Sequence, residues 1–466
     1  MITDLPAELQ LMIFDAIKKP DKRNPRRRRQ ALVNQRGYSK HSENAARRAL
    51  FNLSLTCRKY RSLLVPTLFD RVTLLNETDS AASVVGLATS ELGHYVKHFR
   101  FEGSLQGEEY KMAMQPFAPD INEGSAENLD KVIEAILPTP VHNILSDLHD
   151  WFSNLEIVRV HFEYDNSWGT DRFNYPGGLV QSVLFAETSS EPAMVVKLAS
   201  WEILMTKAYE ALYQNKHPIK SLHLQDLLPG LVSTFATPDF HKFLSRLETF
   251  KISVSSSYSD DRFFAKRSGG DSNLYKQFGN LFFNHLASVK HLTIKAGLAR
   301  REYDNTYPST VPFATTQTPM LKSIRIQGIL ISMALIDFLA NHCNTLEHVF
   351  FDDCVAAHFN WATQSYWTNT WGELFKALAG SDCKSSTLRK LDITPIKSSE
   401  IVGPTTVVDV SCEEELFTHA KAGMFVYVVS RSPWQFRRFI RRDDMRWYQA
   451  VREVIRANKG KGRRIL

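Results

Sequence analysis

A six-residue pattern of apolar and polar positions recurs eight times along the chain. Each copy, here called a hexad, has an aliphatic residue, two mostly polar positions, and then an apolar–polar–apolar ending. Because the ending alternates with period two, each hexad predicts a short, half-buried β-strand. The eight hexads are Val96–Phe101, Leu155–Val160, Ile219–Leu224, Leu247–Ile252, Val289–Ile294, Leu321–Ile326, Leu346–Phe351 and Leu388–Ile393.

Helical spacing fills several intervals between the hexads. Apolar residues recur at threes and fours in 198–212, 335–339 and 374–378, each just before a hexad. A helix followed by a strand, repeated, predicts parallel strands with helices packed outside them. The alternative is an ordinary α/β domain whose strands are similar by chance, which eight copies in one phase disfavour.

The hexad spacing L-x-x-L-x-L resembles that of leucine-rich repeats, and Cys354 stands where that family uses Asn or Cys. The resemblance implies a solenoid of parallel strands and outer helices over residues 76–400. Successive hexads start 25 to 64 residues apart. This spacing is far from uniform, so we expect an irregular solenoid with long loops.

The C-terminal residues 401–466 are expected to close the solenoid as a cap with a basic helix and tail. Within Trp434–Ala457, the residues Trp447, Val451, Val454 and Ile455 mark one apolar helical face. A helix that covers the last repeat explains this face. The alternative is a basic amphipathic helix that binds phosphates of nucleic acid or of a membrane surface.

Apolar residues also recur at helical spacing in two stretches before the first hexad. The first stretch starts with Pro6, whose missing N–H costs nothing in a first helical turn. The second is predicted to end at Pro66. Short helices of this kind cannot bury all their apolar faces alone, so some faces should contact a partner. The residues on these faces are Leu9, Ile13 and Ile17 in the first stretch, and Cys57, Tyr60 and Leu64 in the second.

Together the two stretches are similar to an F-box over residues 4–75. Leu-Pro-x-Glu-Leu-x-x-x-Ile-Phe occupies 5–14, and Leu-Ser-x-x-Cys-Arg-x-Tyr with a closing Leu-Leu occupies 53–64. The chain thus resembles the divergent F-box/leucine-rich-repeat proteins of fungi, whose F-box docks on the Skp adaptor of a cullin-type ubiquitin ligase and whose repeats hold the substrate. The resemblance implies these adaptor-binding residues: Leu5, Pro6, Leu9, Ile13, Phe14, Leu53, Cys57, Tyr60 and Leu64.

The expected fold is therefore α/β, with three parts. A three-helix F-box covers residues 1–75, an irregular leucine-rich-repeat solenoid covers 76–400, and a helical cap covers 401–466. The chain departs from the F-box pattern at 18–48, where a basic insertion replaces a short loop.

The net charge of +7 is concentrated in two segments. Residues 18–48 carry +10 and residues 431–466 carry +9, so the other 399 residues carry −12. The run Arg26–Arg29 is a candidate nuclear-import or nucleic-acid patch, and a solvated loop is the simpler interpretation. The acidic body counts against a continuous nucleic-acid groove.

Composition and motifs narrow the class of protein further. Hydrophobic residues at 43% and charged residues at 23% are ordinary globular values, and no apolar run is long enough to span a bilayer. Five cysteines without a Cys-x-x-Cys pair argue for a reducing compartment and against a zinc site. The chain has no phosphate loop, zinc-protease motif or nucleophile elbow. We therefore expect a non-catalytic protein without cofactor or metal, in the cytoplasm or the nucleus.

The third and fifth hexad positions are expected to share the face of the strands that points away from the helices. Of these sixteen residues, five are Lys or Arg, four are His and one is acidic. This bias suggests that the face binds an acidic or phosphorylated segment, and that its histidines strengthen binding as the pH falls toward ~6. The candidate substrate-binding residues are His98, Arg100, Arg159, His223, Lys251, His291, Arg325, His348 and Phe350.

Two alternatives to this binding face remain at this stage. Irregular repeats could break the surface, or acids at the second hexad position, such as Glu156 and Glu248, could neutralise it. For the whole chain we expect a substrate receptor of a cullin-type ubiquitin ligase, which binds the Skp adaptor and cullin through the F-box and an unknown protein substrate through the repeats. The alternative is a nucleic-acid-associated or ligase-independent scaffold that uses segments 18–48 and 431–466.

Overall fold

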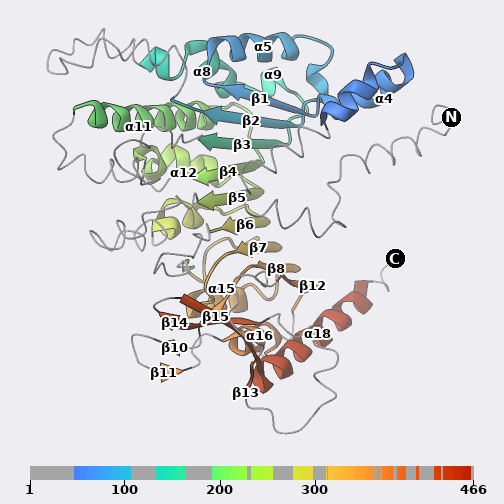
Figure 1. Cartoon of the computed structure of the whole chain (residues 1–466), viewed down its shortest axis with the longest axis vertical. Helices are drawn as coiled ribbons and strands as arrows, with labels where there is room; N and C mark the ends of the chain where they lie inside the picture. The colour runs from blue at the N-terminus through green and yellow to red at the C-terminus, as the bar shows by residue number, and fades with distance from the viewer. Residues whose placement is uncertain are drawn as a thin grey trace.

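The centre of the molecule is a parallel sheet of nine strands, which follow one another in chain order (Figure 1). The computed structural model describes residues 47–105, 133–162, 192–227, 232–254, 277–296, 311, 313–357, 359–360, 365–366, 370–380, 386–394, 406–408, 425–431 and 434–462. The strands are β1 (Arg71–Leu75), β2 (His98–Gly103), β3 (Ile157–Phe162), β4 (Ser221–Leu227), β5 (Thr249–Val254), β6 (His291–Lys295), β7 (Ser323–Gln327), β8 (His348–Asp352) and β12 (Lys390–Thr394).

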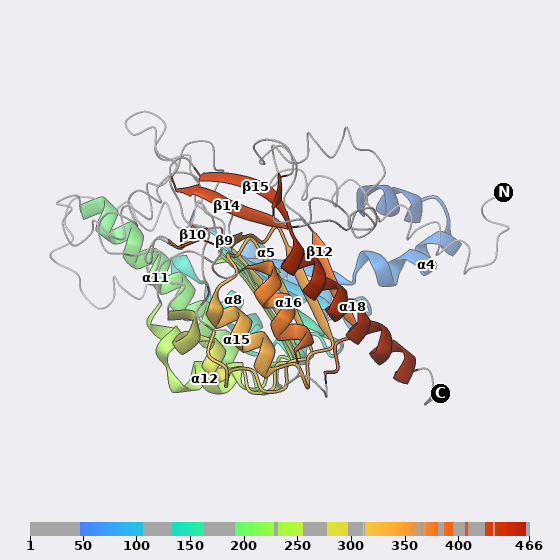
Figure 2. The same ribbon diagram turned by 90° about the horizontal axis from the view of Figure 1, so that it is seen from below.

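Helices connect the strands, and α8, α12, α15 and α16 lie on the same side of the stack when it is seen from its end (Figure 2). The helices predicted over 198–212, 335–339 and 374–378 are confirmed as α11, α15 and α16. The chain is thus an α/β protein with parallel strands. The α-helices between strands are α5 (Thr78–Ala88), α8 (Thr139–Ser146), α9 (Leu148–Trp151), α11 (Pro192–Tyr213), α12 (Pro238–Leu244), α15 (Met333–Asn341) and α16 (Trp371–Ala379). Three short 3₁₀ helices lie at η2 (Gly93–Tyr95), η6 (Ser233–Ala236) and η7 (Phe283–His285).

All eight hexads form strands of this sheet, and each strand begins at the third hexad residue. The backbone carbonyl at the second hexad position accepts two hydrogen bonds, from the N–H groups of the second and third residues of the next hexad. Lys97, for example, accepts from Glu156 at 2.8 Å and from Ile157 at 3.0 Å. The same arrangement recurs at every junction except β3–β4, where pairing begins at Val158↔Leu222. Because every junction keeps one register, equivalent hexad positions lie side by side across the sheet.

The first strand, β1, comes from a ninth hexad that the sequence analysis missed. Residues Phe69–Leu74 follow the same pattern, but Phe69 replaces the aliphatic residue at the first position. Arg71 pairs with His98 and Thr73 with Arg100, which is the register of the other junctions. The sheet therefore begins before residue 76, within the range that the sequence analysis assigned to the F-box.

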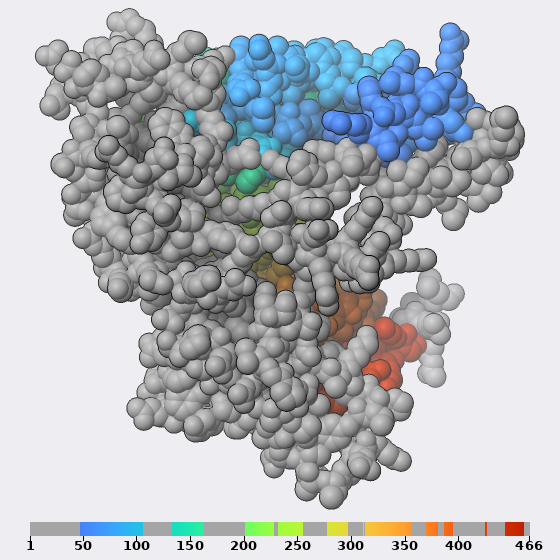
Figure 3. Space-filling model, in the orientation of Figure 1, coloured from blue at the N-terminus to red at the C-terminus, as the bar shows by residue number. Residues whose placement is uncertain are grey.

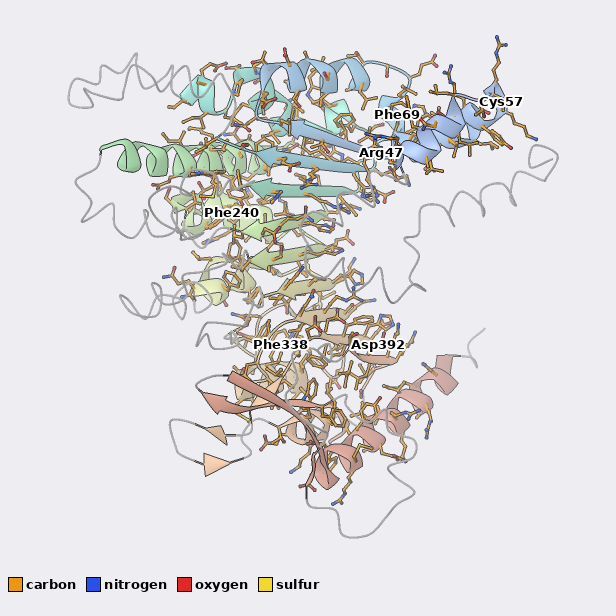
Figure 4. All side chains as sticks on the ribbon, in the orientation of Figure 1. Arg47, Cys57, Phe69, Phe240, Phe338 and Asp392 are labelled. Carbon is orange, nitrogen blue, oxygen red and sulfur yellow. The ribbon has the colours of Figure 1, made fainter. Side chains whose placement is uncertain are left out.

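The core lies between the sheet and the helices. In β2–β8, every fourth and sixth hexad residue is at most 2% exposed. In β12, the corresponding Leu391 and Ile393 are half-buried, because β12 is the last strand of the sheet. Behind the strands a series of ring contacts of 4.6–6.0 Å runs along the stack, and Figure 4 shows two of its members, Phe240 and Phe338. Its other rings are Tyr209, Phe235, Phe282, Phe278, Phe283 and Phe313.

A second, smaller sheet and a helix follow the ninth strand. The sheet has the order β13 (Thr406–Val408), β15 (Trp434–Arg441), β14 (Val426–Arg431), β9 (Ala356–Ala357), and a separate two-stranded ribbon pairs β10 (Phe359–Asn360) with β11 (Ser365–Tyr366). The helical interpretation of residues 434–441 is therefore wrong. This segment pairs with β14 and β13 as a strand. Helix α18 (Arg442–Gly462) begins directly afterwards.

Helix α18 covers the end of the stack by packing on α16. Val451 is fully buried in the main core, with Trp447 and Ile455 partly buried against it. The buried carboxylate of Asp444 accepts a hydrogen bond from the N–H of Gly372 at 2.7 Å, in the first turn of α16. A negative charge at a helix N-terminus is favourable because it faces unsatisfied N–H groups. The apolar face predicted for this segment is thus explained by packing against the core.

Buried asparagines join neighbouring repeats at their loops. Asn76, after β1, accepts a hydrogen bond from the Ser104 N–H at 2.8 Å and donates to the carbonyls of Ser104 and Ile136 at 2.8 and 2.9 Å. Its side chain thereby satisfies three backbone groups of segments that follow β2. Asn215 has a similar role, because it accepts from Leu148 N–H and donates to the Leu145 carbonyl.

We expect Asn76→Ala to lower the free energy of unfolding by about 2–3 kcal/mol, since it leaves buried backbone groups without a partner. Urea denaturation followed by circular dichroism measures the change. Asn341→Ala is the matched control, because Asn341 is exposed and donates to the Asp337 carbonyl of its own helix. A loss no larger than that of the control would show that Asn76 is not a structural clamp.

Candidate functional site

A small helical module precedes the sheet and has a core of its own. It consists of helical residues 47–54 and α4 (Arg58–Leu68). Leu50, Tyr60, Leu64 and Leu68 form a buried cluster that is separate from the main core. In Figure 1 the module lies beside the starting end of β1.

Two members of the predicted adaptor-binding set lie in this buried cluster. Tyr60 is 6% exposed and Leu64 is fully buried, so their side chains hold the module together and offer little surface to a partner. Leu53 and Cys57 are half-buried, and the Cys57 sulfur accepts a hydrogen bond from the Tyr60 N–H at 3.4 Å. Helix α4 also continues past Pro66 to Leu68, because a proline in the last turn removes only one helical hydrogen bond. The remaining predicted residues, Leu5, Pro6, Leu9, Ile13 and Phe14, lie outside the described residues.

Two large apolar side chains of the module face solvent instead. Phe51 is 51% exposed and Leu55 is 56% exposed, one helical turn apart. Sequence reasoning missed both, because it followed the spacing of the buried residues. The module is fixed to the sheet by Arg47, which donates to the carbonyls of Leu68 at 2.7 Å and Arg71 at 3.3 Å. The space-filling view shows the module as a projecting part of the surface at the β1 end (Figure 3), and Figure 4 labels Arg47, Cys57 and Phe69 within it.

The second candidate surface is the strand face that carries the third and fifth hexad positions. The register pairs Arg100 with Arg159, Arg159 with His223, and His223 with Lys251. We call these four fifth-position residues of β2–β5 the basic ladder. Because strands lie about 4.8 Å apart, the ladder is a row of cationic and imidazole side chains at that spacing.

The structure brings all nine candidate substrate-binding residues onto this one face. Exposure differs among them. His291 and Arg325 are exposed, whereas His223 is only 5% exposed. The other six are half-buried: His98, Arg100, Arg159, Lys251, His348 and Phe350. His223 is therefore a buried part of the face and offers little direct contact area to a ligand.

The acids at the second hexad position do not neutralise the basic ladder. Glu156 binds Lys97 at 2.8 Å, and Glu248 binds Lys290 at 2.8 Å and Lys220 at 3.6 Å. All five residues are second-position residues of adjacent strands, so they form a separate row of ion pairs at the strand starts. The hydrogen bonds from Lys97 and Lys290 lower the pKa values of Glu156 and Glu248.

Burial and neighbouring cations lower the pKa values of two residues of the ladder. Burial lowers the pKa of Lys251, and the charges of Arg159 and Arg325 lower it further. Burial, followed by the charges of Lys251 and Arg159, lowers the pKa of His223 to about 3. Glu102, which sequence reasoning missed because it follows the hexad, lies 3.4 Å from Arg100.

The predicted role of the histidines in acid-strengthened binding does not hold for His223. Burial lowers the pKa of His223 to about 3, so its imidazole stays neutral near pH 6, and burial lowers the pKa values of His98 and His291 as well. The sequence could not reveal this shift, because it depends on desolvation and on cations of neighbouring strands.

On the same strand face, the cations of β7 and β12 have aromatic and carboxylate partners. The Phe350 ring lies between two cations, with Arg325 Cζ at 4.8 Å and Lys390 Nζ at 5.1 Å from its centroid. Both cations also have carboxylate partners: Arg325 lies 3.5 Å from Asp352, and Lys390 lies 2.9 Å from Asp392. Charge at this end is therefore balanced.

Comparisons with known proteins do not assign the chain to a family. No protein-family model matches it, and a search of curated proteins finds no significant match. Among the described residues, no cluster of three His, Cys, Asp or Glu side chains could hold a metal ion. None of the helices in the described part of the chain has the length and apolar character needed to cross a membrane.

We expect His223 to make the fold less stable in acid. Its folded-state pKa lies below the unfolded value near 6.5, so the unfolded state binds the extra proton and stability falls with pH below about 6.5. The loss between about pH 7 and pH 5 should be roughly 2 kcal/mol. His223→Gln should remove most of it in urea denaturation at both pH values. The exposed His94→Gln is the control, and equal pH dependence in all three proteins would contradict the shift.

Proposed function

We propose that the chain is a non-catalytic substrate receptor of a cullin-type ubiquitin ligase, with an F-box-like module and a leucine-rich-repeat-like solenoid. The observation that carries the proposal is the division into a helical module with its own small core and a long in-register array. The module exposes an apolar pair, and the array exposes a polar strand face. In this proposal the helical module binds the adaptor, and the strand face of the array binds the substrate.

The exposed pair in the module supports the adaptor role. Phe51 and Leu55 are two of the four large hydrophobic side chains that stand out as exposed in the described residues. Aromatic and aliphatic anchors of this kind commonly dominate the binding energy of protein interfaces. The resemblance of residues 5–14 and 53–64 to an F-box gives the partner its identity, a Skp-type adaptor.

The alternative role in nucleic-acid binding has less support. Arg446, Arg452 and Arg456 are exposed on α18, but the opposite side of that helix is buried against the end of the stack. A capping role therefore explains why the helix is amphipathic. Its arginines are then ordinary surface residues of a capping helix.

The test is co-purification with a Skp-type adaptor. Phe51→Glu with Leu55→Glu should weaken adaptor binding by more than about tenfold, because interface anchors typically contribute about 2 kcal/mol or more. Met320→Glu with Met333→Glu is the matched control, since these two side chains are also about half exposed but lie far along the chain. Thermal unfolding shows whether both variants stay folded. Unchanged adaptor affinity in the folded Phe51/Leu55 variant would overturn the proposal.

A further inference from the structure

The nine-stranded sheet ends in β1 on one side and in β12 on the other, and the free edge of β1 is partly covered. Arg47 donates to the Arg71 carbonyl at 3.3 Å, and the Leu75 N–H donates to the Ser80 hydroxyl at 2.9 Å. The unpaired backbone groups of an edge strand are a site where another strand can add, and side chains bonded to those groups block it. Strand β1 is therefore protected at both of its ends.

The free edge of β12 presents the backbone groups of Leu391 and Ile393. The Lys390 N–H donates to the Glu347 carbonyl of the neighbouring strand at 3.1 Å. Since the backbone groups of successive residues point to opposite sides of a strand, those of Leu391 and Ile393 point away from β8. Within the part of the chain that the structure describes, no strand or side chain bonds to them. Both side chains are half-buried, so a further strand would also cover apolar surface.

The strand-face side chains of β12 carry opposite charges in a fixed order. Lys390 and Asp392 occupy the third and fifth hexad positions, and Figure 4 labels Asp392 at this end of the sheet. The two side chains are 50% and 47% exposed, and their charged atoms lie 2.9 Å apart. Opposite charges that face each other across two strands stabilise the pairing of those strands. A strand with the reverse order of charges would therefore give each of these groups a second partner.

We propose that the free edge of β12 binds β12 of a second copy of this chain, antiparallel to it about a twofold axis. Three registers let the outward backbone groups of Leu391 and Ile393 bond across the axis. The register centred on Leu391 puts Lys390 opposite Asp392 of the second copy, twice. The register that pairs Leu391 with Ile393 puts Asp392 opposite Asp392, and the register centred on Ile393 puts Asp392 opposite Thr394. The charges of β12 thus select one register, which is self-complementary.

The selected register also has the spacing that an ion pair needs. Leu391 forms the hydrogen-bonded pair on the axis, and Lys390 with Asp392 forms the flanking pairs, which have no backbone bonds. Side chains approach most closely in such flanking pairs, where the Cα atoms lie about 4.5 Å apart. The self-complementary order of charges favours a second copy over an unrelated strand. Adaptor binding is a separate property, because the helical module lies at the opposite end of the sheet (Figure 1).

Sedimentation velocity of the full chain over a range of concentrations tests the proposal, and we expect a reversible monomer–dimer equilibrium. Lys390→Asp puts carboxylates opposite each other and should weaken the dimer by about tenfold or more, and Asp392→Lys should do the same with ammonium groups. Lys242→Asp, at an exposed position on α12, is the matched control and should leave the dimer unchanged. A chain that stays monomeric at its highest soluble concentration, or a dimer that Lys390→Asp leaves intact, would overturn the proposal.

A mixture of the two variants separates ion pairing in this register from a loss of folding. The Lys390→Asp chain has two carboxylates on its edge strand and the Asp392→Lys chain has two ammonium groups, so the mixture should form dimers that neither variant forms alone. The doubly exchanged chain, Lys390→Asp with Asp392→Lys, restores the opposite order and should dimerise as the original chain does. Thermal unfolding shows whether each variant is folded. If a single variant is unfolded, the doubly exchanged chain decides, and a monomer there contradicts the register.

Discussion

One backbone arrangement determines most of this structure: a second-position carbonyl accepts two N–H groups from the start of the next strand. At every junction except β3–β4 it fixes where the next strand begins and which residue lies beside which. Since side chains alternate with period two, a slip of one residue at any junction would move a whole strand's apolar set to the wrong face. The uninterrupted column of buried fourth- and sixth-position residues from β2 to β8 is a direct consequence. The basic ladder on the opposite face is the other consequence.

The same register brings like charges together, and the magnitudes show why the fold tolerates this. Two unit charges one strand spacing apart repel by about 0.9 kcal/mol at the dielectric constant of water, and by several times more when partly buried. Full burial of one large apolar side chain contributes about 1.5–3 kcal/mol. Each of the strands β2–β8 buries two such side chains, and the ring contacts behind the sheet add to this. Packing on one face thus offsets electrostatic repulsion on the other.

The two candidate surfaces belong to separate packing units. The module is stabilised by four buried side chains of its own and is joined to β1 through Arg47 and the start of the sheet. The ladder lies on β2–β5 and is stabilised by the main core. A substitution on one surface therefore has no direct packing route to the other.

The sequence by itself determined the phase of eight strands, the face that each side chain occupies, and the helices over 198–212, 335–339 and 374–378. These properties follow from local periodicity, which a single stretch of chain carries. The structure alone decided strand β1 (Arg71–Leu75), the strand at 434–441, and the burial of Tyr60 and Leu64. It also decided which acid binds which lysine and that His223 stays neutral. The ion pairs and the neutral state of His223 depend on desolvation and on charges from strands 28 to 64 residues away in the chain, so no local pattern encodes them.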